Sequence, residues 1–507
     1  MRSLLRRATA ALAGGWLAAC APAAPTPELP APRAAAPRAP APDAVLAETP
    51  DDTLRYKPPL VLAARGHPPP RVEEITSSNG IRALLIERHD LPLVAARVVL
   101  RRRERPSVPD LQRLIAPTLL ETASAGGKSL FTELWSLGVF RDYFTDDDSI
   151  QLEFEAAAPV FGEALRRYLT TLAAPTISKE ALDEVRKNIT TALRNREKRG
   201  PPPLRARLIR SIDEQLFPRD HRYSDFRDST ATDMDALKLA DMQRYRDREL
   251  DPARVTVCVV GDVTPTALRE AIEGATSAWK PASASPPNAA PGLARGVFLV
   301  EQPDETRADV AVVVPAPSIA TAQGLIATMA NAQLSDALRG WLKREVKTPW
   351  SEHSAESVVR GDASLIRVAV EVDPEAIVPV VRGILEIMER LGKGEISGEV
   401  LASHRNFSLR WQEALFKSNS EAVKSLAVIP SLGVAPDFLS RRYQATLTAS
   451  QDDVVKLARD WLKRGEVRVV AIGNVAAAKP EIQKLGLGPV KLVRAGAGEP
   501  IAPRKTQ

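Results

Sequence analysis

Cysteine, histidine and aromatic residues are scarce in this chain of 507 residues. Two cysteines exclude a disulfide-rich scaffold and any cysteine-rich metal site. No uncharged apolar run approaches the roughly 20 residues that span a bilayer, which excludes a multi-pass membrane protein. The net charge is +6, of which Arg2, Arg6 and Arg7 supply three. The remainder is too weakly basic and too poor in aromatic residues for a nucleic-acid-binding protein, so no nucleic-acid partner is expected.

The N-terminus has the pattern of a secretory signal. Three arginines precede a short apolar stretch, Ala8 to Ala19, so residues 1–19 are predicted to be a signal peptide. The stretch ends Leu-Ala-Ala-Cys20, which resembles the bacterial lipobox, and the resemblance implies lipidation of Cys20. Acyl chains would then hold the protein to a membrane, and Ala21 favours the outer membrane by the usual sorting rule. The alternative is a plain signal cut elsewhere, with Cys20 a chance residue.

A segment rich in proline and alanine follows, and residues 20–72 are predicted to be the lipidated cysteine and a tether. Such a composition buries little and favours extended, polyproline-like backbone. The alternative for its last part, near Pro58 to Pro70, is that it folds onto the first domain.

The rest of the chain contains an internal repeat. A strand pattern, Arg254-Val-Thr-Val-Cys-Val-Val-Gly261-Asp, returns 212 residues later as Glu466-Val-Arg-Val-Val-Ala-Ile-Gly473-Asn. Strand–turn–strand patterns also begin both halves, at residues 82–100 and 297–314. In the middle of the halves, an offset of 219 residues aligns one set with another: Leu165, Tyr168, Leu172, Ser178, Glu180 and Leu182 with Ile384, Ile387, Leu391, Ser397, Glu399 and Leu401.

The repeat defines the predicted domain organisation. Residues 73–280 and 294–490 are predicted to be two homologous domains, joined by a linker at 281–293 that is rich in proline, serine and alanine. Residues 491–507 lack periodicity and are predicted to be a loose tail. The order of strands and helices predicts an α+β fold, in which each domain is a mainly antiparallel sheet covered by helices.

This organisation resembles the insulinase/pitrilysin family of zinc peptidases. The resemblance rests on the repeat and on three motifs in order: Asn79-Gly-Ile-Arg-Ala-Leu-Leu-Ile, His89-Asp-Leu-Pro-Leu-Val and Asp220-His-Arg-Tyr-Ser. It implies two insulinase-like domains that face each other as a clamshell around an unfolded polypeptide.

The zinc motif of that family is degenerate here. Active members carry H-x-x-E-H on a helix, where two histidines bind zinc and the glutamate activates water. Thr118 and Thr122 stand at the histidine positions, Glu121 at the glutamate position, and Ala192 where a later glutamate would complete the site. Threonine and alanine cannot replace imidazole and carboxylate ligands, so no metal and no cofactor are expected. A zinc site built from distant histidines, or a residual base role for Glu121, is the alternative.

A second set of family residues is also degenerate. Some bacterial relatives divide the work between two chains, one with the zinc motif and one with an arginine and a tyrosine in the second unit. Ala337 and Trp350 stand at these two positions. Alanine has no donor, and tryptophan has one N–H but no hydroxyl. Arg339 is the alternative arginine if the register shifts by two residues.

The sequence therefore favours a lipid-anchored protein of the cell envelope, on the periplasmic side of the outer membrane. It is expected to be a pseudoenzyme, either a non-catalytic subunit or a polypeptide-binding clamshell that holds an extended strand against a sheet edge. The expected partners are a second insulinase-family subunit, an unfolded peptide or protein, and the membrane through Cys20. Two other classes stay open: an active zinc-dependent endopeptidase and a structural envelope protein.

Overall fold

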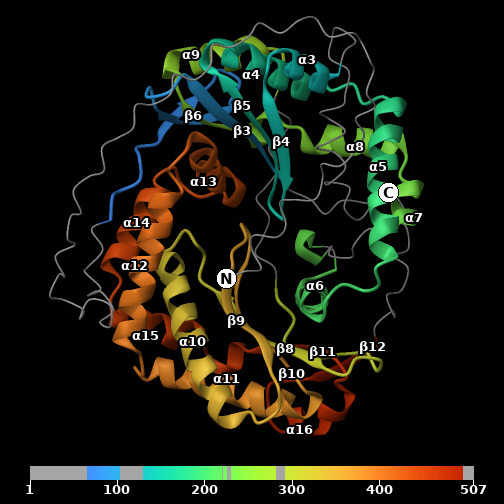
Figure 1. Ribbon diagram of the computed structural model, residues 1–507, viewed down its shortest axis with the longest axis vertical. Coiled ribbons are helices and arrows are strands. Elements are labelled where there is room, and N and C mark those ends of the chain that lie inside the picture. Colours follow the sequence, from blue (N-terminus) through green and yellow to red (C-terminus); the bar gives the residue numbers. More distant parts are fainter. Residues whose placement is uncertain (1–65, 103–128, 220, 225–229, 281–291, 495–507) are drawn as a thin grey trace, which may run out of the picture. The chain divides into compact units, whose positions relative to one another are not determined.

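The computed structural model describes residues 66–102, 129–219, 221–224, 230–280 and 292–494, all of which lie in one compact unit, Leu62–Gln507. They form two six-stranded sheets with helices packed on them (Figure 1). The predicted α+β fold is confirmed. Within the described ranges, no helix is both long and apolar enough to cross a membrane.

The first sheet has the strand order β1-β2-β6-β3-β5-β4. Its strands are β1 (Glu73–Thr76), β2 (Arg82–Glu87), β3 (Leu93–Arg101), β4 (Phe140–Thr145), β5 (Ser149–Ala157) and β6 (Val255–Gly261). The helices of this half are α3 (Leu130–Ser136), α4 (Ala158–Ala173), α5 (Lys179–Glu197), α6 (Leu204–Leu216), α7 (Ala231–Ala236), α8 (Leu239–Glu249) and α9 (Pro265–Thr276). Among the described strands of this sheet only β2 and β6 pair in parallel, so the sheet is mainly antiparallel as predicted.

The second sheet has the order β12-β7-β11-β8-β10-β9. Its strands are β7 (Gly296–Glu301), β8 (Ala308–Ala316), β9 (Ser351–Val358), β10 (Ser364–Val372), β11 (Arg468–Gly473) and β12 (Val490–Arg494). The helices are α10 (Ala322–Glu345), α11 (Ile377–Gly392), α12 (Gly398–Ala414), α13 (Asn419–Leu432), α14 (Phe438–Thr448), α15 (Gln451–Trp461) and α16 (Lys479–Gln483). Here β7 pairs in parallel with both β11 and β12.

The two halves repeat one topology. The order β2-β6-β3-β5-β4 in the first sheet is repeated as β7-β11-β8-β10-β9 in the second. The helix starts repeat as well, since Ser178 caps α5 by accepting a hydrogen bond from Ala181 N, and Ser397 caps α12 by accepting one from Val400 N. A serine at this position satisfies an N–H group that has no partner within the helix. The aligned serines Ser178 and Ser397 are therefore both helix N-caps.

Gly261 and Gly473 end the equivalent strands β6 and β11, with φ of 142° and 120°. A Cβ atom on either glycine would lie 2.2 Å from a backbone oxygen of the neighbouring strand, that of Leu93 or Arg307 respectively. Only glycine fits such a close approach at positive φ. The glycine is therefore repeated because the same close approach between two neighbouring strands is repeated.

The central strands of both sheets are buried on both faces. Helices α3, α4 and α9 pack on one face of the first sheet, and α10, α11 and α15 pack on one face of the second (Figure 1). The opposite faces are covered by exchange: α13 of the second half packs on β3 and β6, whereas α6 of the first half packs on β8 and β11. This coverage explains why β3 and β8 are nearly continuous apolar runs rather than alternating ones.

The prediction that the loose tail begins at residue 491 is wrong, because a strand extends to residue 494. Residues 490–494 form β12, which pairs with β7 at the edge of the second sheet. Its sequence, Val-Lys-Leu-Val-Arg, is too short to show a period, and the parallel pairing partner lies almost 200 residues away in the sequence.

Candidate functional site

Most of the degenerate zinc motif lies outside the described residues. Thr118, Glu121 and Thr122 fall within 103–128, and Cys20 falls within 1–65, so their predicted roles stay predictions. Ala192 is described: it lies on the exposed face of α5 and offers no ligand atom. In the described part of the chain, no group of three or more His, Cys, Asp or Glu side chains is placed to hold a metal ion.

The carboxylate that follows Ala192 on α5 has a structural partner. Glu197 Oε1 accepts a hydrogen bond of 3.0 Å from Ala231 N at the start of α7. Arg194, on the same helix, pairs with Asp235 of α7 at 2.9 Å. These contacts fasten α5 to α7, so Glu197 belongs to a helix-to-helix contact.

In the second half, Ala337 and Trp350 both pack against the core of the second domain. The Trp350 ring meets His353 edge-on, with ring centroids 5.3 Å apart. Arg339 Nε lies 3.4 Å from His353 Nε2. Burial, with the neighbouring Arg339 and Arg205, lowers the pKa of His353, so its neutral ring can accept this bond. The structure therefore brings Arg339, His353 and Trp350 together, while Ala337 leaves the predicted arginine position without a donor.

The start of β9 is clamped from the other half. Arg205 of α6 binds Asp309 of β8, donates to Ser354 Oγ at 3.1 Å and also donates to the carbonyl of Glu352. Glu352 has φ of 45°, a conformation that a non-glycine residue keeps only when its surroundings hold it. The Asp309 side chain has no exposed surface, and burial raises its pKa to about 6 although Arg205 acts in the opposite direction. Arg205 of α6 therefore fixes the backbone of the segment next to Trp350.

A buried network of charges joins the equivalent hairpin turns of the two halves. The turn Asp146–Asp148 precedes β5, and the turn at Arg360–Asp362 precedes β10. Arg360 binds Asp213 of α6 through two hydrogen bonds of 2.6 and 2.8 Å and binds Asp147 at 2.8 Å. The aspartate run Asp146–Asp148 is therefore one side of the contact between the halves.

Arg222 and Tyr223, from the Asp220-His-Arg-Tyr-Ser motif, complete this network. Arg222 binds Asp148 at 2.5 Å and Asp362 at 2.9 Å, and the Tyr223 hydroxyl donates to Asp148 at 2.5 Å. The motif that carried the family resemblance therefore has a structural role in the described residues.

The edge strand β4 carries aromatic residues. Among the described strands it pairs only with β5, so its other edge has no strand partner within the described ranges. Phe140 and Phe144 lie on the same face of the strand, because side chains alternate, and are 71% and 49% exposed. Tyr143 of β4 and Trp135 of α3 are exposed as well. Natural edge strands are normally protected by charged residues, proline or a covering segment, so a free aromatic edge indicates a binding surface.

The equivalent edge strand of the second sheet, β9, differs from β4 in composition. Strand β9 reads Ser-Glu-His-Ser-Ala-Glu-Ser-Val, and its polar groups are engaged. Glu356 pairs with Arg367 at 2.7 Å, and Ser357 Oγ accepts from Asn331 at 2.8 Å. A cavity of about 210 Å³ lies beside β9, but its charged walls, Asp213, Glu356, Arg360 and Arg367, are paired with one another. The aromatic edge of β4 is therefore the better candidate for binding.

The comparisons with known proteins agree with this fold. Residues 236–407 match the family model described as the peptidase M16 inactive domain. No curated protein is similar enough in sequence to count as a match.

Solved structures are similar over most of the chain. A peptidase M16 inactive domain from Pseudomonas fluorescens has a TM-score of 0.67 at 13% identity, covering 80% of this chain and 98% of that one. A protease from Helicobacter pylori has a TM-score of 0.66 at 16% identity, covering 80% and 99%. A chain of complex III2 from Candida albicans, solved with Inz-5 bound, has a TM-score of 0.62 at 12% identity, covering 82% and 99%.

The protein thus has the fold of the peptidase M16 family, and the predicted resemblance to insulinase-like proteins is confirmed. The matched segment is the domain type described as inactive.

Proposed function

We propose that this chain is a non-catalytic, polypeptide-binding member of the insulinase fold that works beside a catalytic relative. The observation that carries the proposal is the outer edge of β4, which no other described strand pairs with, and its exposed Phe140, Tyr143 and Phe144. An extended peptide can add to such an edge through backbone hydrogen bonds, while the aromatic rings cover its apolar side chains. This mode of binding needs no metal ion.

The absence of catalysis is proposed from the residues at the family positions. Thr118, Thr122 and Ala192 supply no imidazole or carboxylate, and Ala337 supplies no donor for a substrate carbonyl. The match to a domain described as inactive supports the same conclusion.

A catalytic relative as partner is proposed for the same reason: a chain that holds a polypeptide without cutting it becomes useful beside one that cuts. The structural similarity to a chain of complex III2, a multi-subunit assembly, supports a role as a subunit. Peptidase activity that is equal in a co-purified pair and in the relative alone would contradict this part of the proposal.

We also propose that the mature protein begins at Cys20, carries lipid there and works in the periplasm on the outer membrane. Metabolic labelling with a palmitate analogue tests this directly. Label should be present on the wild type and absent from Cys20→Ala, and label on both would contradict the assignment.

The binding surface can be tested with a fluorescently labelled, permanently unfolded protein, such as reduced and carboxymethylated lactalbumin. The paired change Phe140→Ser and Phe144→Ser should weaken binding about 10-fold or more, since burying each ring is worth roughly 1.5–3 kcal/mol. The matched control is Phe407→Ser with Trp411→Ser, because these rings are 64% and 56% exposed on α12, away from β4. Equal losses in both pairs would refute the assignment of the site to β4.

A further inference from the structure

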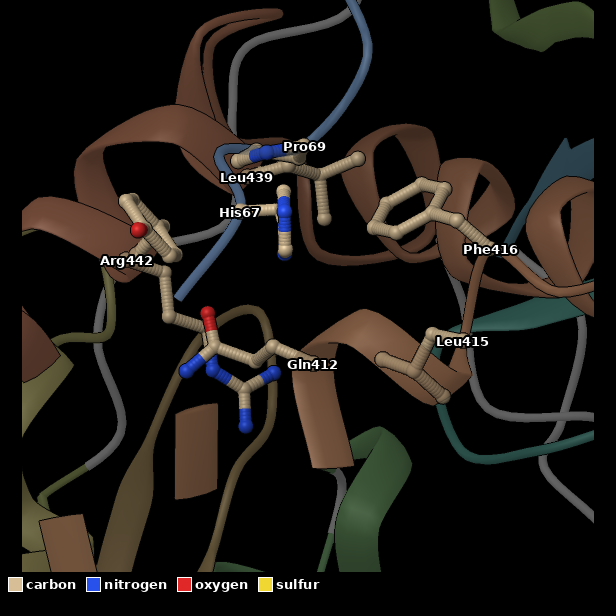
Figure 2. A pocket seen from close by; sticks show the side chains of 8 residues that line it. His67, Pro69, Gln412, Leu415, Phe416, Leu439 and Arg442 are labelled. Atoms are coloured by element: carbon tan, nitrogen blue, oxygen red, sulfur yellow. The ribbon is translucent and has the colours of Figure 1, made fainter. Parts of the chain in front are cut away.

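A small pocket lies where the first described residues pass over the second half of the chain. His67 is anchored there, because its backbone N–H donates to Glu413 Oε1 at 2.8 Å. Gln412 and Phe416 line the pocket from α12 and the turn after it, and Leu439 and Arg442 line it from α14. Figure 2 shows Arg442 and Gln412 on one side of His67 and Phe416 on the other.

Arg442 is partly buried and differs from the buried arginines described above. Arg360 and Arg222 each bind two carboxylates. The Arg442 guanidinium has no hydrogen-bond or ion-pair partner among the described residues, although burial lowers its pKa. Of the nearby charged groups, Glu413 accepts a hydrogen bond of 2.8 Å from the His67 backbone N–H, and Arg441 pairs with Asp437. A guanidinium that is partly removed from water and lacks a partner favours an anion beside it.

The walls of the pocket select the kind of anion. No acidic residue lines it, and the Tyr443 hydroxyl, also in the wall, has no hydrogen-bond partner among the described residues. Pro69, Leu415, Phe416 and Leu439 make the rest of the wall apolar. One guanidinium neutralises one negative charge, and its planar fork matches a carboxylate with two parallel hydrogen bonds.

The size of the pocket limits what enters. The volume open to the centre of a water molecule is about 20 Å³. A single water needs roughly 10–15 Å³ of such volume. One small head group therefore fits, and a longer molecule would leave its remainder outside.

We propose that this pocket binds a carboxylate group, with Arg442 as the partner of both oxygens and Tyr443 as a second donor. The carboxylate comes either from a free organic acid or from an acidic side chain or C-terminus of a polypeptide. The site is on α12 and α14, so it is separate from the β4 edge and does not rest on the proposed peptide binding there.

The test measures binding to the mature chain by calorimetry at constant ionic strength. The probes are potassium acetate, an acidic peptide blocked at both ends, the same peptide with a free C-terminus, and potassium chloride. Arg442→Met should lower carboxylate affinity about 10- to 100-fold, the loss expected for charge-assisted hydrogen bonds. Tyr443→Phe, which keeps the ring packed against Gly66, should lower it several-fold. The control, Arg441→Met, should leave the affinity unchanged.

The outcomes separate the possible sources. Tighter binding of acetate than of the peptides assigns the site to free acids, and tighter binding of a peptide assigns it to polypeptides. Equal binding of chloride and carboxylates, or equal affinity in wild type and Arg442→Met, would overturn the proposal. In the absence of ligand, Arg442→Met should be at least as stable as wild type, because it removes a partly buried charge that lacks a partner among the described residues. A marked loss of stability would show instead that Arg442 has a structural partner.

Discussion

Replacing Arg360 by methionine should destabilise the contact between the two halves. The Arg360 and Asp213 side chains are only 6% and 4% exposed, and they share two hydrogen bonds. Methionine keeps most of the bulk but leaves the Asp213 carboxylate buried without its main partner. Breaking a buried ion pair from one side costs about 3–5 kcal/mol, which is a large part of the stability of most proteins.

Urea-induced unfolding followed by circular dichroism measures this loss. The matched control is Lys393→Met. Lys393 follows the last residue of α11 and pairs with Glu389, which lies on the exposed surface of that helix. Water screens that exposed pair, so its loss should leave the unfolding free energy almost unchanged. The double change Arg360→Met with Asp213→Leu should recover most of the loss, since an apolar replacement of both partners leaves no buried charge.

The pH dependence supplies a second readout. Burial raises the pKa of Asp213, and Arg360 opposes this rise. Without Arg360 the folded-state pKa of Asp213 rises further above its unfolded value. The folded variant then binds a proton more tightly than the unfolded chain, so its stability should increase as the pH falls. A loss below 1 kcal/mol at pH 7, or a loss that grows as the pH falls towards 5, would refute the reasoning.

Three further predictions concern the repeat and the clamp. Gly261→Ala should lower the unfolding free energy by about 2–3 kcal/mol, because its Cβ would meet a backbone oxygen. The control is Gly274→Ala, in open space within α9, which should raise the unfolding free energy by up to about 1 kcal/mol. Thermal unfolding compares the two variants. Ser178→Ala should lower the unfolding free energy by about 1 kcal/mol through loss of the α5 cap, and an unchanged value would contradict the capping role. Asp309, with its pKa raised to about 6, contributes stability that is present below about pH 4 and lost as the pH rises through 6. Asp309→Asn should therefore flatten the fall of unfolding free energy between pH 4 and 6, and an unchanged slope would argue against that titration.

The repeat and the sheets could be predicted from the sequence because their signals are local. Apolar runs such as β3 and β6, the serine caps and the strand-ending Gly261 each depend on neighbours a few residues away. The 212-residue repeat of these signals then predicted the strand order that the two sheets share.

The exchange of α6 and α13 could not be predicted in this way. An amphipathic helix shows that one of its faces is buried, but its sequence does not indicate which of two similar sheets it covers. The network of Asp147, Asp213 and Arg360 depends on this exchange, since its members are far apart in the sequence. The partner of each charge is set by the packing of the two halves.

The candidate site was predicted only in part. The approach of Trp350 to Arg339 through His353 follows from the packing of α10 beside β9, which the sequence does not specify. The aromatic edge carried a local signal, Phe-Arg-Asp-Tyr-Phe at 140–144, but only the strand order shows that this strand lies at the edge of the sheet.

The central claim is that the chain holds an unfolded polypeptide without cutting it. The most direct test incubates the mature protein with excess zinc and a labelled unfolded protein, then measures bound zinc by mass spectrometry of the metal and the integrity of the retained protein. We expect the polypeptide to be retained intact and zinc to stay far below one ion per chain. One zinc per chain, together with cleavage that Glu121→Gln abolishes, would contradict the central claim.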